Sequence, residues 1–419
     1  MVQKVTLLRF DTVMADPTKI GPNTCVHLGP GTFITAGYYE GFTGGAKLQP
    51  GMRLVGSGMD VTILRRVNSV PMSVHAYAIG HALTQTVPTV QPNLMDFCEI
   101  AEMTIDCNFG EVSNGQAAAG AIRMMGNHSR VVRVKIVNWG GIPGIAPSFG
   151  ILVITGNTNS GDARSDVAGV VNCGIQECIA INPGLNSNGT FIALQVGAKE
   201  TPGTVEAVGV GPYIVNNYVE GLGVTSAKRV GLGISWCTAG VVEGNQVEKV
   251  DSGLGMMYEA GLRGVRDATI RNNAFRSVGV AIGIQATTES RQDVLIHGNW
   301  FSFSASTRPV EIQYLGTPTT VPGNTSIRGN RFSILGASQL NEAAYIQGAT
   351  TIQVGENILD PITSGVPALY FSGVGAAKFF ENRTTDGTLV RGYNSTTSQY
   401  LGEMATDVED ALVLGLMQR

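Results

Sequence analysis

The stretch IRNNAF, residues 270–275, is one copy of a motif that recurs along the chain. The template is an apolar residue, any residue, a small or polar residue, an asparagine, any residue and usually an apolar residue. The other copies are IVNNYV (214–219), VEGNQV (242–247), IHGNWF (296–301), IRGNRF (327–332), VGENIL (354–359) and FFENRT (379–384). Their asparagines follow one another at intervals of 25 to 31 residues. Self-similarity of this period indicates a solenoid.

The composition selects the kind of solenoid. Glycine accounts for 55 of the 419 residues, and short β-branched runs are broken by Gly, Asn or Pro, which is typical of strands separated by turns. Weaker copies of the motif, TIDCNF (104–109), KIVNWG (135–140) and VVNCGI (170–175), extend the repeat over about residues 97–384. A rung of this length has no room for a long helix. We therefore expect an all-β fold, a right-handed parallel β-helix of about ten rungs, stacked about 4.8 Å apart.

The repeated asparagine has a structural role in such a fold. At the bend between two strands it can adopt the left-handed conformation, and its amide can bond the asparagine of the next rung. We expect this ladder at Asn217, Asn245, Asn273, Asn299, Asn330 and Asn357.

The N-terminal stretches VHLGPGTFITAG (26–37) and KLQPGMRLVGSGMDVTILRR (47–66), followed by the asparagine repeat, resemble the pectate-lyase-like right-handed β-helix superfamily. The resemblance covers residues 23–384 and implies the fold. It does not set the activity, because the superfamily includes polysaccharide lyases, glycoside hydrolases, sugar epimerases, esterases and viral tailspikes. The polygalacturonase elements N-T-D, D-D and G-H-G are absent, as are the W-x-D-H and R-x-P-x-x-R runs of pectate lyases.

The chain divides into three parts. Residues 1–96 are expected to form the N-terminal strands and first rungs, residues 97–384 the β-helix core, and residues 385–419 a C-terminal cap. Within the last part, Thr406 and Glu409 form a capping box before an apolar face, which predicts a short helix over the open end of the solenoid.

A recurring apolar-Gln pair predicts a functional surface. Strand alternation places successive side chains on opposite faces. We expect inward side chains at Leu194, Trp236, Tyr258, Ile284, Ile312 and Ile346. The residues that follow them form an outward column: Gln195, Cys237, Glu259, Gln285, Gln313, Gln347 and Ser372. A parallel column two residues earlier contains Ala193, Ser235, Met257, Gly283, Glu311, Tyr345 and Tyr370.

These two columns suit a sugar chain, since amides bond hydroxyl groups and Tyr offers an apolar face. We expect Gln285, Gln313, Gln347 and Tyr345 to bind substrate. Glu259 and Glu311 are the candidate catalytic residues, about 12 Å apart between Cα atoms by the rung and strand spacings. Inverting glycosidases hold their carboxyl groups about 6.5–9.5 Å apart. A lyase would instead need a base and a cation beside the uronate carboxylate, for which Arg263 and Arg291 are candidates.

Charge and motif content limit the partners. The net charge of −4 provides no basic surface for nucleic acid or anionic membranes, and no apolar run reaches the length of a membrane span. The histidines are scattered and the six cysteines have no C-x-x-C spacing, so we expect no metal or other cofactor and reduced, buried thiols. The sequence MVQKVTLLRFDTVMADP lacks the pattern of a signal peptide. The location of the protein therefore stays open, and the candidates are an extracellular or a virion-associated location.

Two classes of function remain open at this stage. The first is a carbohydrate-active enzyme, a lyase or a glycoside hydrolase, that acts on a polysaccharide along the two columns. The second is a non-catalytic polysaccharide-binding or structural solenoid, such as a tailspike-like virion protein. β-Helices of this size resemble trimeric spikes, so a homotrimer is an expectation to be tested.

Overall fold

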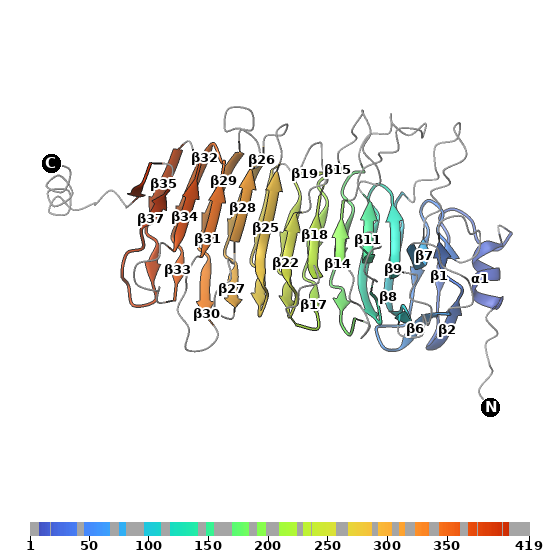
Figure 1. The fold of residues 1–419 in the computed structure, drawn as a ribbon. Coiled ribbons are helices and arrows are strands. Elements are labelled where there is room, and N and C mark those ends of the chain that lie inside the picture. The colour runs from blue at the N-terminus through green and yellow to red at the C-terminus, as the bar shows by residue number, and fades with distance from the viewer. Residues whose placement is uncertain are drawn as a thin grey trace, which may run out of the picture.

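Short β-branched and apolar runs form parallel strands that stack in sequence order along one axis (Figure 1). The computed structural model describes these residues: 8–16, 18–39, 46–67, 75–80, 96–109, 118–140, 148–154, 170–183, 191–197, 209–223, 229–235, 237–256, 267–286, 292–303, 310–314, 323–334, 343–360, 368–374, 376–395 and 397–401. For some strand residues, including Gln285, Glu311 and Gln313, the structure describes only the backbone. The architecture is the expected right-handed parallel β-helix.

The first sheet contains two strands from most rungs, one before and one after the repeated asparagine. The strands before it are β1 (Cys25–His27), β5 (Arg53–Val55), β8 (Glu99–Asp106), β10 (Arg130–Val137), β12 (Gly174–Gln176), β16 (Tyr213–Val215), β20 (Val241–Glu243), β23 (Ala268–Arg271), β26 (Gln292–His297), β29 (Gly323–Arg328), β32 (Thr351–Gly355) and β35 (Ala376–Phe380). The strands after it are β2 (Gly31–Thr35), β6 (Thr62–Arg66), β13 (Ile179–Ala180), β17 (Tyr218–Glu220), β21 (Gln246–Glu248), β24 (Ala274–Arg276), β27 (Trp300–Phe303), β30 (Arg331–Ile334), β33 (Ile358–Leu359) and β36 (Arg383–Thr384). β8 and β10 span both positions.

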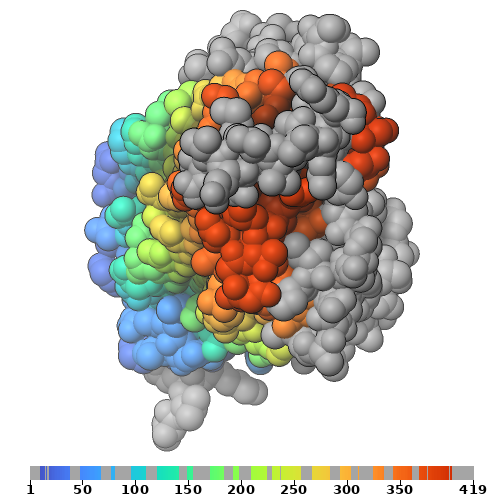
Figure 2. All heavy atoms as spheres, turned by 90° about the vertical axis from the view of Figure 1, so that its left-hand side faces the viewer, coloured from blue at the N-terminus to red at the C-terminus, as the bar shows by residue number. Residues whose placement is uncertain are grey.

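The second sheet closes each rung. Its strands are β3 (Tyr38–Tyr39), β4 (Ala46–Lys47), β7 (His75–Gly80), β9 (Ala118–Met125), β11 (Ser148–Ile154), β14 (Phe191–Val196), β18 (Arg229–Ile234), β22 (Ser252–Met256), β25 (Val280–Ala286), β28 (Val310–Tyr314), β31 (Ala344–Gln347), β34 (Leu369–Ser372), β37 (Gly392–Asn394) and β38 (Gln399–Leu401). A small third sheet pairs β15 (Gly209–Val210) with β19 (Cys237–Thr238). Figure 2 looks onto the C-terminal end, where residues of the last rungs appear in orange and red.

The asparagine ladder is confirmed and joins seven rungs, from Asn217 to Asn382. At each step Nδ2 donates to Oδ1 of the next asparagine, at 2.8 to 3.0 Å. The same Oδ1 also accepts from the backbone N–H of the preceding ladder asparagine. A second Nδ2 bond reaches a buried carbonyl, such as Val242 O for Asn273 at 3.0 Å. Each ladder asparagine is therefore buried and satisfied.

One detail of the ladder differs from the expectation. The left-handed residue is the one before the ladder asparagine, for example Asn272 with φ of 55° or Gly298 with φ of 65°. Bond satisfaction, not backbone conformation, therefore selects asparagine at the ladder position. The weaker upstream copies are not ladder members, since the residue that donates its backbone N–H to Asn217 Oδ1 is Cys178.

Apolar side chains fill the space between the sheets. Phe275, Phe301 and Phe332 occupy the same position in successive rungs, with ring centroids 5.7 and 4.9 Å apart. Each lies two residues after a ladder asparagine, so one motif specifies both the bend and the core. Rings at these separations gain stacking energy beyond the area that they bury.

The N-terminal end is covered by a helix that the sequence motifs did not predict. α1 (Leu8–Ala15) buries Phe10 and Met14 against the first strands (Figure 1). Asp11 accepts hydrogen bonds from the Thr35 hydroxyl at 2.7 Å and from the backbone N–H of Ala36 at 2.8 Å. The predicted C-terminal helix lies outside the described residues. In the part that is described, the antiparallel pair β37 and β38 follows the last rungs.

Ion pairs between rungs cover part of the outer face of the first sheet. Glu99 bonds Arg53 and Arg130 on the two flanking strands, each at 2.6 Å. Burial opposes ionisation of the Glu99 carboxyl, but the hydrogen bonds from Arg53 and then Arg130 outweigh it, so its pKa lies below its usual value.

Among the described residues no helix is long and apolar enough to cross a membrane.

The burial expected of the cysteines holds for all but Cys25. All six are free, and five of them are buried while Cys25 is exposed. Burial raises the pKa of the Cys98 thiol to about 11 and that of the Cys107 thiol to about 12. These thiols therefore pack as small apolar side chains.

Candidate functional site

Two outward columns on the second sheet bring together much of the surface that the sequence predicted. The strand register aligns Gly283, Glu311, Tyr345, Tyr370 and Tyr393, which we call the tyrosine column. Two residues further along the strands it aligns Gln285, Gln313, Gln347 and Ser372, which we call the glutamine column. The expected neighbours in this C-terminal half are therefore confirmed by the register of β25, β28, β31 and β34.

The alternation of these strands explains why the columns face outward. In β31 and β34 the residues alternate between buried and half-buried. The buried ones, Ala344 and Ile346 in β31 and Leu369 and Phe371 in β34, are fully enclosed in the core. Apolar burial on one face thereby fixes Tyr345, Gln347 and Tyr370 on the other.

The tyrosine rings form a continuous stack. The rings of Tyr345 and Tyr370 are stacked and nearly parallel, with centroids 5.5 Å apart and planes at 11°. Tyr393 continues the stack, with its centroid 5.9 Å from that of Tyr370 and the planes tilted by 44°. The Tyr345 hydroxyl donates to Gln347 Oε1 at 3.4 Å, which links the two columns. The result is a strip in which aromatic faces lie beside amide groups.

Tyr393 is a member of the column that was not predicted from the sequence. Its context, GYN at 392–394, follows the same order as AYI at 344–346 and LYF at 369–371. The tyrosine between an apolar or small residue and a buried one, in the segment that follows the last asparagine repeat, is the signal that could have identified it.

The upstream half of the predicted columns is wrong by two residues. Met256, not Tyr258, pairs with Ile284, and Gln195 pairs with Gly233. Through Gly233, Gly255 and Gly283 the register continues into the tyrosine column, so Gln195 belongs there and not with Gln285. Cys237 lies in β19, in the third sheet. Rung length varies, and a motif on one sheet does not set the register on another.

Gln195 is also buried instead of outward and accessible. Its Nε2 donates to Ser235 Oγ at 2.9 Å and to the carbonyl of Gly197. Gly233 provides the room, because a Cβ at that position would lie 1.7 Å from Gln195 Oε1. This glutamine therefore has a structural role.

The remaining predicted residues divide into two groups. Glu311, Gln285 and Gln313 lie on described strands at the expected positions, with Glu311 next to Tyr345 in the tyrosine column. Glu259, Arg263 and Arg291 lie outside the described residues, so their roles stay predictions.

The described side chains offer no obvious place for a metal. Within the described ranges no group of three or more His, Cys, Asp or Glu side chains is arranged to hold an ion. What the strip offers instead is stacking from three rings and hydrogen bonding from amides and hydroxyls.

Comparison with known proteins finds similar folds among solved structures. No protein-family model matches the sequence, and the search of curated proteins found no match. Among solved structures, the A-module of mannuronan C-5 epimerase AlgE6 from Azotobacter vinelandii is similar over 86% of each chain, with a TM-score of 0.53 and 12% identity. PfbA, a surface adhesin of Streptococcus pneumoniae, matches with a TM-score of 0.51 and 14% identity, over 95% of this chain and 91% of that one.

A third neighbour has a similar length. DFA-IIIase from Arthrobacter chlorophenolicus A6, in complex with DFA-III, has a TM-score of 0.50 and 13% identity, and covers 91% of this chain and 90% of its own. At such identities the likeness concerns the fold. Together with the asparagine ladder and the parallel register of the rungs, these matches show that the chain has the right-handed parallel β-helix fold.

Proposed function

We propose that the protein binds a polysaccharide along the tyrosine and glutamine columns and acts on it there as a lyase or glycoside hydrolase. The observation that carries the proposal is the stack of Tyr345, Tyr370 and Tyr393 beside Gln347. A neighbour named as a mannuronan C-5 epimerase supports a carbohydrate ligand for this fold.

The chemistry of the strip matches that of a sugar chain. Pyranose rings have an apolar face of C–H groups, which the half-buried tyrosine rings can contact, and a rim of hydroxyls, which amides can bond as donor and acceptor. The rungs repeat about every 4.8 Å, which is close to the length of one sugar residue. A chain that lies along the solenoid axis would therefore pass the rings of Tyr345, Tyr370 and Tyr393 on successive rungs, with the Gln347 amide beside the first of them.

Glu311 is the residue that we propose for proton transfer, because its strand position lies next to Tyr345 in the tyrosine column. Hydrolysis with inversion needs a second carboxylate about 6.5–9.5 Å away, and Glu259 is the candidate for it. Elimination needs one base and a cation that stabilises the enolate, and Arg263 and Arg291 are the candidates. The two reactions thus make different demands on the same strip.

The test offers a panel of acidic and neutral polysaccharides to the purified protein. New reducing ends alone indicate hydrolysis, whereas new reducing ends together with the absorbance of an unsaturated sugar indicate elimination. We expect activity to fall by at least about a hundredfold in Glu311→Gln, as is typical for loss of a general acid or base. Glu259→Gln measured in parallel assigns the second carboxylate.

Binding is measured separately on the same panel. Tyr370→Ala removes the central ring of the stack and should weaken binding by about tenfold, a typical value for an aromatic contact. Tyr218→Ala, on the first sheet, is the matched control and should bind like the wild type. Retained binding without any product would place the protein in the non-catalytic class, alongside the adhesin-like use of the fold. Wild-type binding by Tyr370→Ala would overturn the proposed site.

A further inference from the structure

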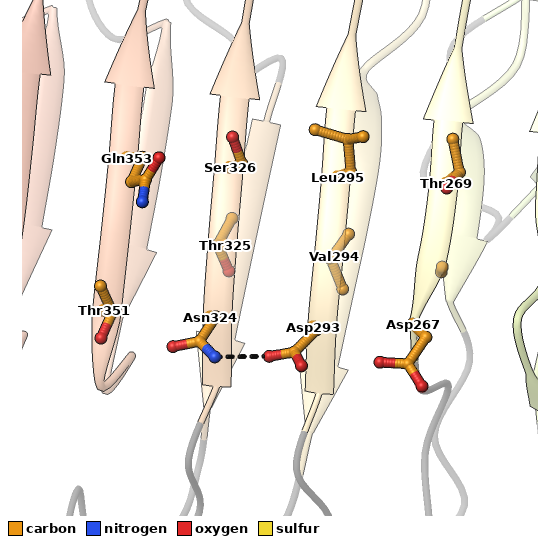
Figure 3. Close-up of a pocket in the computed structure, with 11 residues that line it drawn as sticks. Asp267, Thr269, Asp293, Val294, Leu295, Asn324, Thr325, Ser326, Thr351 and Gln353 are labelled. Carbon is orange, nitrogen blue, oxygen red and sulfur yellow. Dashed lines mark hydrogen bonds between the residues drawn. The ribbon is translucent and has the colours of Figure 1, made fainter.

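A row of side chains lies where the chain enters the strands of the first sheet, and two of its members are aromatic. Gly51, Phe97, His128 and Asn172 are aligned on successive rungs, because each lies two residues before an aligned position of β5, β8, β10 or β12. Figure 3 shows a later part of the same row, beside a groove over β23, β26, β29 and β32. There the row consists of short polar residues: Asp267, Asp293, Asn324 and Thr351. Phe97 and His128 therefore differ from the rest of their surroundings in this row.

The backbone at both aromatic residues is in the left-handed region. Phe97 has φ of 58° and His128 has φ of 55°. Glycine adopts this region freely and asparagine tolerates it, as at Gly51 and Asn172, whereas a larger side chain is destabilised there by contact with its own backbone. Among the described residues other than glycine with positive φ, Phe97 is the one large apolar residue. The turn by itself would therefore select glycine or asparagine at position 97.

The two rings are stacked on the surface of the protein. Their centroids are 5.1 Å apart and their planes are inclined by 16°. Cys98 and Ser129, the next residues along the chain, are buried, so strand alternation directs Phe97 and His128 outward. Phe97 is 64% exposed, and its ring contributes little to the core. An unfavourable backbone conformation that burial does not offset indicates a functional role for the side chain.

Two guanidinium groups lie beside the rings, two residues further along the strands. Glu99 contacts Arg53 and Arg130 through Nε and Nη2 of each. The Glu99 side chain is 10% exposed, whereas the arginine side chains are 54% and 51% exposed. One buried carboxylate beneath two accessible guanidinium groups gives this surface a net positive charge. Nη1 of each arginine takes no part in the contacts with Glu99, so an anion can bond there.

The rings and the cations together determine the type of ligand. Exposed rings offer an apolar face, which suits the C–H face of a pyranose, and guanidinium groups bond carboxylate or sulfate oxygens. A ligand with both features is an anionic sugar. A nucleic acid also combines rings with anions, but its binding depends on the neutralisation of several phosphates. Two arginines against one glutamate supply an excess of a single positive charge, which favours the sugar.

We propose that this corner of the solenoid binds an anionic sugar residue of a glycan. The sugar ring stacks on the exposed ring of Phe97, beside His128. Its carboxylate or sulfate group bonds Nη1 of Arg53 and Arg130, which Glu99 holds in place from below. The site lies toward the N-terminal end of the first sheet, whereas the tyrosine column lies on the second sheet toward the C-terminal end (Figure 1). It does not depend on the reaction proposed for that column.

The experiment titrates the full-length protein with three tetrasaccharides and measures binding by calorimetry. The probes are β-1,4-linked glucuronic acid, its uncharged glucose counterpart and the sulfate ester of that counterpart. We expect at least one anionic probe to bind about tenfold more tightly than the uncharged one, since hydrogen bonds between charged groups are stronger than neutral ones. The ratio of the two anionic affinities tells whether the site prefers carboxylate or sulfate. Hydrogen exchange read by mass spectrometry should show protection of the peptides that contain residues 96–99 and 127–130.

Two variants separate the ring from the charge. Phe97→Asn removes the ring but keeps a residue that tolerates the left-handed conformation. We expect this variant to bind the preferred anionic probe about tenfold more weakly, while its melting temperature stays the same or rises. A merely structural role of the ring would instead lower the melting temperature. Arg130→Gln should weaken binding of the anionic probe by about tenfold and leave binding of the glucose probe unchanged.

The matched control is Arg65→Gln. Arg65 bonds another buried carboxylate, that of Asp106 at 2.7 Å, and is exposed to a similar extent as Arg130. Asp106 lies at the far end of β8 from Glu99, away from the rings. This variant should bind all three probes like the wild type. Tyr370→Ala should retain the protection of residues 96–99, which separates the site from the tyrosine column.

Several outcomes would overturn the inference. It is wrong if neither anionic probe binds, if all three probes bind equally, or if Phe97→Asn binds like the wild type. It is also wrong if the anionic probe protects the peptides of the tyrosine column and leaves residues 96–99 unprotected. A single-stranded oligonucleotide that binds more tightly than both anionic probes, with the same loss in Phe97→Asn, would assign the site to nucleic acid instead.

Discussion

The asparagine ladder makes a quantitative prediction for Asn273→Ala. The amide of Asn273 donates to Asn299 Oδ1 and to Val242 O, and it accepts from Nδ2 and the backbone N–H of Asn245. The alanine variant loses all four bonds in a site where Asn273 is 1% exposed, so water cannot replace them without opening the solenoid. A buried polar group left without a partner costs about 1–3 kcal/mol. Allowing for relaxation, we expect a loss of about 3–5 kcal/mol in the free energy of unfolding.

Position in the ladder supplies an internal comparison. Asn382 accepts from Asn357 and donates to Val354 O, at the end of the described ladder. Asn382→Ala should therefore cost less, about 1–3 kcal/mol. Asn272→Gly is the matched control, because Asn272 precedes the ladder residue at a φ of 55° that glycine adopts freely. Its effect should stay within about 0.5 kcal/mol.

The assay must resolve local stability, because repeats of a solenoid can unfold separately. Urea denaturation gives the overall loss, and hydrogen exchange read by mass spectrometry gives the loss in the peptides that contain Asn245 and Asn273. We expect exchange to accelerate in these rungs and less in distant ones. A loss below about 1 kcal/mol for Asn273→Ala, or an effect equal to that of Asn272→Gly, would refute the ladder as a source of stability.

Further predictions concern pH, thiols, metals and assembly. Because the pKa of Glu99 is lowered by folding, its contribution is complete at neutral pH and is lost as pH falls through the acidic range; Glu99→Gln should flatten the dependence of unfolding free energy on pH there, and an unchanged slope would contradict the ion-pair assignment. A thiol reagent at pH 8 should label Cys25 in the native protein and all six cysteines after denaturation, whereas fast native labelling of Cys107 would show that the core opens. Chelation should leave the melting temperature unchanged, and a large drop would reveal a structural metal. Light scattering should give a multiple of 44.0 kDa that corresponds to a trimer, and the monomer mass would exclude that assembly.

The sequence alone determined the fold and its repeat. The period of 25 to 31 residues and the turn-rich, β-branched composition predict the parallel β-helix, and a ladder between rungs explains a buried amide in every repeat. Strand alternation placed Gln313 beside Gln347 and Glu311 beside Tyr345. These features depend on neighbours that are one rung apart and aligned by local pattern.

Other features depend on how long each rung is, which only the tertiary structure decided. The loops differ in length from rung to rung, so the register of the ladder on the first sheet does not carry over to the second. The column position of Gln195 therefore differs by two residues from the predicted one. Because Gln195 is buried beside Gly233, its role is structural and not ligand-binding as predicted. Contacts between rungs, not local propensity, decide which residues become neighbours.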